Sequence, residues 1–117
     1  MPRRSEFLEL VIEQMAGLGT IASRRMFGGH GLYCDGLFIA IISGDKLYFK
    51  VDAQTRSEFE GRGLQRFAYS ARGKTVQLKY YEAPAEVFDE APVMCDWARK
   101  ALEAAVRARA PSRGRPR

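Results

Sequence analysis

The chain has 117 residues, of which 46% are apolar and 28% charged, and these values are typical of one globular domain with a single core. Its longest apolar run, Leu37 to Ile42, is far shorter than the roughly 20 residues that a membrane-spanning helix needs. The N-terminus is polar and basic and is not followed by the apolar segment of a secretory signal, so we expect a cytoplasmic protein without membrane contact.

The net charge of +5 is concentrated at the C-terminal end of the chain. No acidic residue lies among the last eleven residues, and the part of the chain before them has equal numbers of basic and acidic residues. Pro, Gly and Ser favour disorder there, so we expect a domain of residues 1–109 followed by a disordered basic tail of residues 110–117. The tail is a candidate contact to nucleic acid through phosphate charge, although solubility also explains it. The arginines of the last eleven residues are Arg107, Arg109, Arg113, Arg115 and Arg117.

The first expected element is a helix from Ser5 to about Leu18. Ser5 suits the N-cap, and Gly17 and Gly19 suit the end of the helix. Apolar residues recur between these ends at steps of three and four, as on one face of a helix. They are Phe7, Leu8, Val11, Ile12, Met15 and Leu18.

Three antiparallel strands in a meander are expected next, over Gly31–Cys34, Leu37–Ile42 and Leu47–Val51. Asp35-Gly36 is a strong two-residue hairpin signal, and a second short turn at residues 43–46 joins the later pair. The middle strand is continuously apolar, which is typical of a central strand. The last one alternates apolar and polar residues, which indicates one buried face.

A short helix over Ala53–Glu60, capped by Asp52, and two strands over Arg66–Ser70 and Thr75–Tyr81 are expected to follow. A final helix runs from Asp89 to about Arg109, with an apolar stripe rich in alanine. This order predicts an α+β fold in two layers, with helices packed on an antiparallel five-stranded sheet.

Not all tyrosines of the expected strands can point at the helices, because neighbouring side chains on a strand face opposite ways. Tyr33, Tyr48, Tyr69 and Tyr81, with part of Leu37–Ile42, therefore predict an apolar patch on the other face of the sheet. A patch of this kind usually marks a partner surface, so we expect a homodimer.

The segment from Arg24 to Tyr33 is rich in glycine, and a glycine-rich turn can bind phosphate through its backbone N–H groups. The known phosphate-binding fingerprints need a helix directly after the glycines, whereas a strand is expected here. Glycine also permits a β-bulge or a close strand crossing. Both interpretations stay open, as does a role of His30 as acid, base or pH switch instead of a structural hydrogen-bonding residue. The glycines are Gly28, Gly29 and Gly31.

We expect no enzyme, cofactor or metal. No nucleophile lies near His30 in the sequence, and the chain has one histidine and two cysteines, too few for a zinc site. Cys34 and Cys95 are expected to be reduced core thiols. Phe67 and Tyr69 lie beside several cations and resemble a stacking platform for bases, but their alternation also fits packing in a core.

Several strings resemble the N-terminal domain of the TfoX/Sxy family, bacterial proteins linked to natural competence. They are RRMFGGHGLYCDG from Arg24, LYFKVD from Leu47, FAY from Phe67, YYEAP from Tyr80 and WARKAL from Trp97. The resemblance implies an α-β(3)-α-β(2)-α fold similar to type III secretion chaperones. The motif residues are Met26, Phe27, Gly28, Gly29, Gly31 and Tyr33.

The resemblance also implies a role linked to transcription, in which two-domain members assist a DNA-binding activator. The helical second domain of those regulators is not found in this chain, so we expect a stand-alone adaptor that acts through protein contacts, with a homodimer or a transcription regulator as partner. Direct nucleic-acid binding through the tail with Arg24 and Arg25 is an alternative. Small-ligand binding at the glycine turn, lined by His30 and Arg25, is another.

Overall fold

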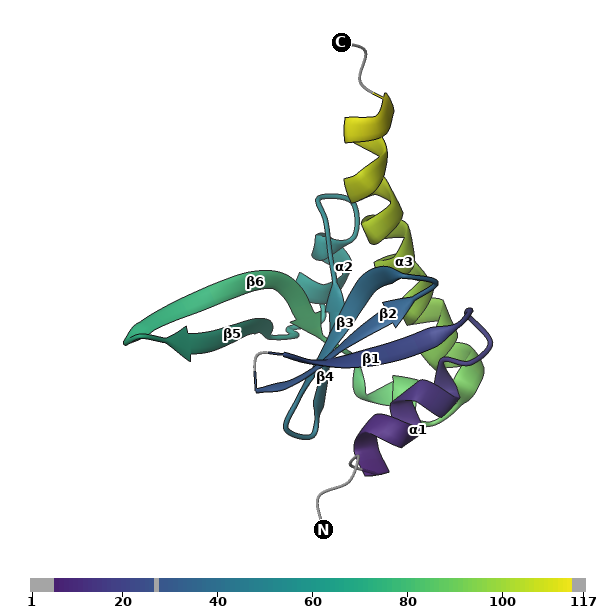
Figure 1. Cartoon of the computed structure of the whole chain (residues 1–117). Coiled ribbons are helices and arrows are strands. Elements are labelled where there is room, and N and C mark those ends of the chain that lie inside the picture. The colour runs from purple at the N-terminus through teal and green to yellow at the C-terminus, as the bar shows by residue number, and fades with distance from the viewer. Residues whose placement is uncertain (1–5, 27, 115–117) are drawn as a thin grey trace.

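The computed structural model describes the backbone of residues 6–26 and 28–114 and the side chains of those residues up to Arg109 (Figure 1). Helices pack on one face of an open antiparallel sheet, which confirms the predicted α+β class. In chain order the elements are α1 (Glu6–Gln14), β1 (Ile21–Met26), β2 (Gly29–Cys34), β3 (Leu37–Ser43), β4 (Lys46–Lys50), α2 (Arg56–Glu60), β5 (Arg66–Ala71), β6 (Lys74–Glu82), the short 3-10 helix η1 (Ala85–Phe88) and α3 (Ala91–Gly114).

The sheet has six strands in the order β1-β2-β3-β4-β6-β5, so the prediction of five strands is wrong. The missed strand is β1, which pairs with β2 from Ile21 opposite Cys34 to Met26 opposite Gly29. Its sequence, IASRRM, does not alternate between apolar and polar residues, because an edge strand at this position buries none of its side chains fully. The similarity to secretion chaperones stays a prediction.

The core lies between the sheet and the helices α1 and α3. Buried side chains of β2, β3 and β4, such as Leu32, Ile39 and Phe49, meet Leu8 and Met15 from the first helix and its following turn. The inner face of α3 is mostly alanine, which lets the helix approach the sheet closely. Its buried residues are Met94, Cys95, Ala98, Ala101, Ala104 and Ala105.

Four helix ends differ from the predicted ones. Helical hydrogen bonding in α1 ends at Gln14, and turns follow up to the glycines. The carboxylate of Asp52 accepts hydrogen bonds from the backbone N–H groups of Gln54 and Thr55, so residues 53–55 form a turn and α2 begins only at Arg56. The last helix begins at Ala91 and continues to Gly114, past the predicted end near Arg109.

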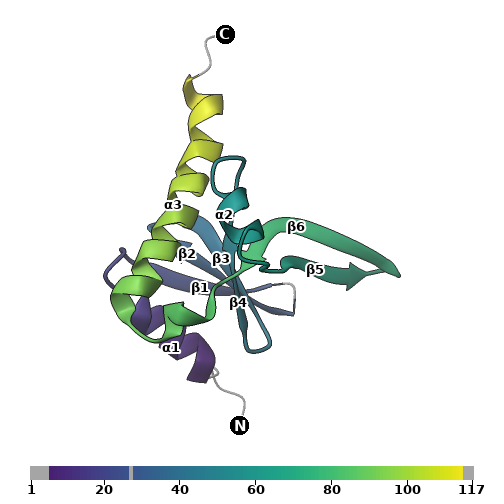
Figure 2. The ribbon, with the colours of Figure 1, turned by 180° about the vertical axis from the view of Figure 1, so that it is seen from behind.

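The β5–β6 hairpin projects away from the helices, as Figure 2 shows from behind. Arg72 and Gly73 in its turn both have positive φ values, 56° and 78°, as a type I′ turn requires. Asp35 and Gly36 have φ values of 50° and 86°, so the predicted hairpin turn between β2 and β3 is confirmed. No helix within the described chain is long and apolar enough to cross a membrane.

Candidate functional site

The sheet face opposite the helices carries a second apolar cluster, which we call the outer face. Alternation along β4 shows the division, since Leu47 and Phe49 join the core while Tyr48 joins this cluster. None of the residues of the cluster comes from a helix. They are the buried Ile41, Phe67 and Tyr80 and the half-buried Phe38, Tyr48, Tyr69 and Leu78.

Aromatic rings form a chain of contacts across the outer face. The ring centroids of Tyr33 and Phe38 lie 5.1 Å apart, and those of Phe38 and Tyr80 lie 5.3 Å apart. Farther along, Tyr48 contacts Phe67 edge to face at 4.9 Å. Such offset and edge contacts add to the stabilisation from burial. The rings are thus well ordered by one another without a helix over them.

Cations stand over the ends of this aromatic chain. The guanidinium of Arg24 lies 5.2 Å from the ring centroid of Tyr33, and the ammonium of Lys50 lies 5.4 Å from that of Tyr80. Burial raises the pKa of the Tyr80 hydroxyl far above its usual value, so the hydroxyl stays neutral beside the cation. The outer face therefore combines aromatic rings with positive charge.

One tyrosine expected on the patch lies elsewhere. Tyr81 belongs to the core cluster on the helix side, where its ring packs near Phe59 and its hydroxyl donates a 2.6 Å hydrogen bond to Glu60. Tyr80 takes a place on the outer face instead. The sequence YY leaves the register open, because either tyrosine can face either side of the sheet.

The glycines between Arg24 and Tyr33 lie in and before β2, with strands on both sides. A Cβ on Gly29 would overlap the carbonyl oxygen of Ile42 in β3, so the two backbones come close at this point. At Gly31 a Cβ would lie 2.6 Å from the sulfur of Met26. Gly28 has a φ of 75° in the turn. These positions serve strand packing and turn geometry, and Phe27 lies outside the described residues.

Arg24 and Arg25 are both exposed on β1 but point to opposite faces of the sheet. Arg24 reaches the outer face at Tyr33, whereas Arg25 pairs across the strands with the half-buried His30. Arg25 and His30 are therefore cross-strand neighbours on the face away from the aromatic rings, and a ligand site at the glycine turn stays a prediction.

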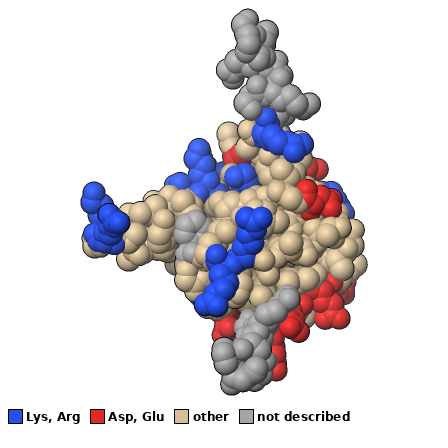
Figure 3. Space-filling view, viewed as in Figure 1, with Lys and Arg blue, Asp and Glu red and all other residues tan. Residues whose placement is uncertain are grey.

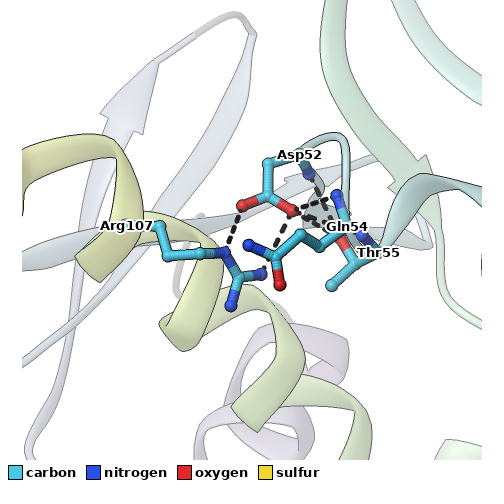
Figure 4. Close-up of polar contacts among 4 residues, drawn as sticks. All are labelled: Asp52, Gln54, Thr55 and Arg107. Atoms are coloured by element: carbon cyan, nitrogen blue, oxygen red, sulfur yellow. Dashed lines mark hydrogen bonds and ion pairs between the residues drawn. The ribbon is translucent and has the colours of Figure 1, made fainter. Parts of the chain in front are cut away.

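Arg107 contacts Asp52, which lies 55 residues earlier in the chain (Figure 4). Its Nε and Nη2 atoms donate hydrogen bonds of 2.6 Å and 3.1 Å to the two carboxylate oxygens. The bond from Arg107, helped by the N–H groups of Gln54 and Thr55, holds the pKa of Asp52 below its usual value. Arg109 is exposed, and the side chains of Arg113, Arg115 and Arg117 lie outside the described residues.

Charges are unevenly distributed on the face drawn in Figure 3. Lys and Arg lie at the left, at the tip of the β5–β6 hairpin, and also across the centre and toward the top, whereas most Asp and Glu lie at the lower right around α1. The turn of the hairpin carries Arg72 and Lys74, and α1 carries Glu6 and Glu9. A charge separation of this kind orients an approaching charged partner.

Among the described residues, no group of three or more His, Cys, Asp or Glu side chains is placed to hold a metal ion. Cys34 and Cys95 are free and buried, which confirms the prediction of core thiols. Burial, and secondarily the charge of Asp35, raises the pKa of the Cys34 thiol, so it is a weak nucleophile at neutral pH.

The profile of the TfoX N-terminal domain matches residues 13–105, which is most of the chain. The chain belongs to the TfoX family. Among its relatives is the DNA transformation protein TfoX1 of Aliivibrio fischeri, which is 27% identical over 75 residues. That stretch covers 64% of this chain and 35% of the relative, so the match spans about a third of TfoX1. The predicted family is thus confirmed, and this TfoX domain belongs to a competence-associated family.

Proposed function

We propose that this TfoX domain is a non-catalytic adaptor in transcription regulation and that it binds a partner protein through its outer face. One observation carries the proposal: a cluster of aromatic and aliphatic side chains occupies a sheet face to which no described helix contributes a residue. The name of the similar relative, a DNA transformation protein, supports a connection with competence.

The composition of the outer face supports protein contact. Tyr, Phe and Arg are enriched in protein interfaces, because they combine a large apolar area with a polar or charged end. Tyr33, Phe38 and Tyr48 are half-buried, so each ring still has surface to lose on binding. Their mutual contacts hold them in place, which lowers the entropy cost of forming the complex.

The charge at the margins of the outer face favours an acidic partner. Arg24 and Lys50 stand over rings of the face, and Arg72 and Lys74 lie at the hairpin tip next to it. In a two-fold dimer through this face, the same cations of both copies would meet at one interface and repel each other. The homodimer expected from the sequence stays a prediction, and we propose an acidic surface of a transcription regulator as the occupant.

The test compares the full chain with two variants in affinity capture from competent cells and in sedimentation velocity. Leu78→Lys places a charge on the outer face, and Leu10→Lys is the control, because Leu10 is 40% exposed on α1. We expect one partner to be captured by the native chain and by Leu10→Lys but not by Leu78→Lys, and its retention to fall as salt rises. Equal capture by all three chains would contradict the proposal.

Sedimentation distinguishes the two occupants of the face. A homodimer through the outer face would become tighter with added salt, since salt screens the repulsion between its cations, whereas an acidic partner would be released. A monomer at all salt concentrations, together with loss of capture by Leu78→Lys, supports the adaptor role without self-association.

Direct nucleic-acid binding is a second candidate, and one observation favours it. Aromatic rings beside cations, as at Tyr33 with Arg24 and at Tyr80 with Lys50, are a surface on which single strands stack. Fluorescence anisotropy with a labelled oligonucleotide tests it. Truncation after Arg109 removes the basic tail of residues 110–117 but keeps the Arg107–Asp52 ion pair, so an unchanged affinity of this truncated chain would exclude residues 110–117 as the contact.

A further inference from the structure

A pocket of about 580 Å³ opens beside the C-terminal end of β4. Its walls come from β4 and the following turn, from the start of α2, from β5 and β6, and from the C-terminal half of α3. Five of its twelve lining residues are cations and one is an acid. The cations are Lys50, Arg56, Arg66, Lys79 and Arg107, and the acid is Asp52.

Two of the five cations already have carboxylate partners. Arg107 is paired with Asp52 through two hydrogen bonds. The Nε atom of Arg56 lies 3.6 Å from Glu60, whose carboxylate also accepts the hydroxyl of Tyr81. Three positive charges of the pocket are then left without a carboxylate partner among the described residues.

These three cations are Lys50, Arg66 and Lys79, each from a different strand of the sheet. Arg66 uses only its Nε atom, in a 2.9 Å hydrogen bond to the carbonyl of Leu78, which leaves its terminal NH₂ groups for other acceptors. Both lysines line the same pocket. Burial lowers the pKa of Lys50, the like charge of Lys79 lowers it further, and the charge of Asp52 opposes this. A bound anion would offset the repulsion between the two lysines.

We propose that this pocket binds a small phosphorylated molecule of about the size of a nucleotide. A phosphate ester carries up to two negative charges, which suits several neighbouring cations better than a single carboxylate does. Arginine binds phosphate through its planar fork of donors, and lysine binds it as a point charge.

The size and the remaining walls of the pocket indicate an organic part on the ligand. The volume lies within the range of about 300–1,000 Å³ of small-molecule sites, and a phosphate alone fills only a fraction of it. Val51, Ala104 and Ala108 supply apolar surface, and the ring of Tyr81 lines the same space. The phosphate is held between Lys50, Arg66 and Lys79, and the organic part lies against α3.

This ligand site goes beyond the adaptor role and occupies another part of the molecule. It is also distinct from the glycine turn, because Arg25 and His30 do not line the pocket. Lys50 lies at the border of the pocket and the outer face, since it lines one and stands over Tyr80 in the other. The decisive variant is therefore Lys79→Gln, at a residue of the pocket alone.

The experiment is calorimetric titration of the full chain at low salt with adenosine monophosphate, inorganic phosphate and citrate. We expect saturable binding of adenosine monophosphate at one site and weaker binding of inorganic phosphate, which lacks the organic part. Lys79→Gln should weaken binding about tenfold, the effect of losing one hydrogen bond to a charged group. Lys74→Gln at the hairpin tip has the same change in net charge and should leave the affinity unchanged.

Several results would overturn the proposal. The first is that adenosine monophosphate shows no saturable binding. The second is that Lys79→Gln and Lys74→Gln lose affinity equally. The third is that citrate binds more tightly than adenosine monophosphate and inorganic phosphate. A single-stranded oligonucleotide that binds through Lys79 while adenosine monophosphate does not bind would assign these cations to nucleic acid instead. Thermal unfolding checks that each variant is folded. If Lys79→Gln is unstable, Arg66→Gln replaces it, because Arg66 also lines the pocket.

Discussion

The ion pair between Asp52 and Arg107 should stabilise the domain measurably, because it ties the end of α3 to the turn that leads into α2. We consider Arg107→Met, which keeps much of the apolar stem of the side chain and removes the charge. The variant loses the hydrogen bonds of 2.6 Å and 3.1 Å to the two oxygens of Asp52.

The loss of stability expected in Arg107→Met follows from how exposed the two side chains of the ion pair are. The side chain of Arg107 is 32% exposed and that of Asp52 is 26% exposed, so the pair is neither fully buried nor freely solvated. A fully exposed ion pair contributes about 0–1 kcal/mol, and a hydrogen bond to a charged group contributes about 1.5–3 kcal/mol. Asp52 keeps its two backbone donors in the variant, so the free energy of unfolding should fall by about 1.5 kcal/mol at neutral pH.

The pH dependence has a definite sign. The pKa of Asp52 is lowered in the folded domain, first by the hydrogen bond from Arg107, so its contribution is fully present above the unfolded pKa of about 3.9. The contribution is lost as the pH falls through the lower, folded pKa. The difference in stability between the native chain and Arg107→Met should therefore be constant near neutral pH and shrink below about pH 4.

Urea unfolding followed by circular dichroism measures both quantities, and a double-mutant cycle with Asp52→Asn isolates the coupling. The control is Arg99→Met, because Arg99 and Asp96 form a more exposed pair, 50% and 73% exposed, within α3. We expect the control to cost less than about 0.5 kcal/mol. An equal loss in both variants, or a loss at Arg107 that is the same at neutral and acidic pH, would refute the reasoning.

Three further predictions concern the strand packing, the core and a thiol. Gly29→Ala should cost more than about 3 kcal/mol in urea unfolding, because its Cβ meets the backbone oxygen of Ile42, whereas Gly31→Ala meets movable side chains and should cost about 1–2 kcal/mol. Phe59→Ala should cost about 3–4 kcal/mol and change the fluorescence of the tryptophan whose ring it contacts. Cys34 should react with a thiol reagent in step with unfolding, since it is fully buried, and fast labelling of the native chain would contradict this.

Periodic patterns in the sequence predicted most of the fold. The alternation of Leu47, Phe49 and Val51 correctly indicated a strand with one buried face, and the alanine-rich stripe around Ala98 and Ala101 indicated a helix packed closely on a sheet. These elements bury one side against the core, so apolar residues recur along them at the period of the helix or strand. The strand β1 has little burial and two adjacent arginines, so its pairing with β2 left no such period.

The candidate sites were only partly predictable, because contacts between distant residues leave no local spacing. A two-sided sheet follows from the tyrosines in the strands, but which of Tyr80 and Tyr81 faces outward depends on register. The three cations of the pocket that have no carboxylate partner among the described residues lie on three strands, and no spacing along the chain marks them as neighbours. The partner of Arg107 was equally hidden, since Asp52 was expected only to cap a helix.

The two adjacent arginines of the family motif, Arg24 and Arg25, have different surroundings, so each can serve a different candidate site. Arg24 stands over Tyr33 on the outer face, where it can take part in binding a partner, while Arg25 points to the helix side next to His30. The period of two in a strand makes this separation unavoidable. Arg24 and Arg25 therefore form a matched pair with equal charge and neighbouring backbone positions. A function that depends on Arg24 alone belongs to the outer face, and one that depends on Arg25 alone belongs to the glycine turn.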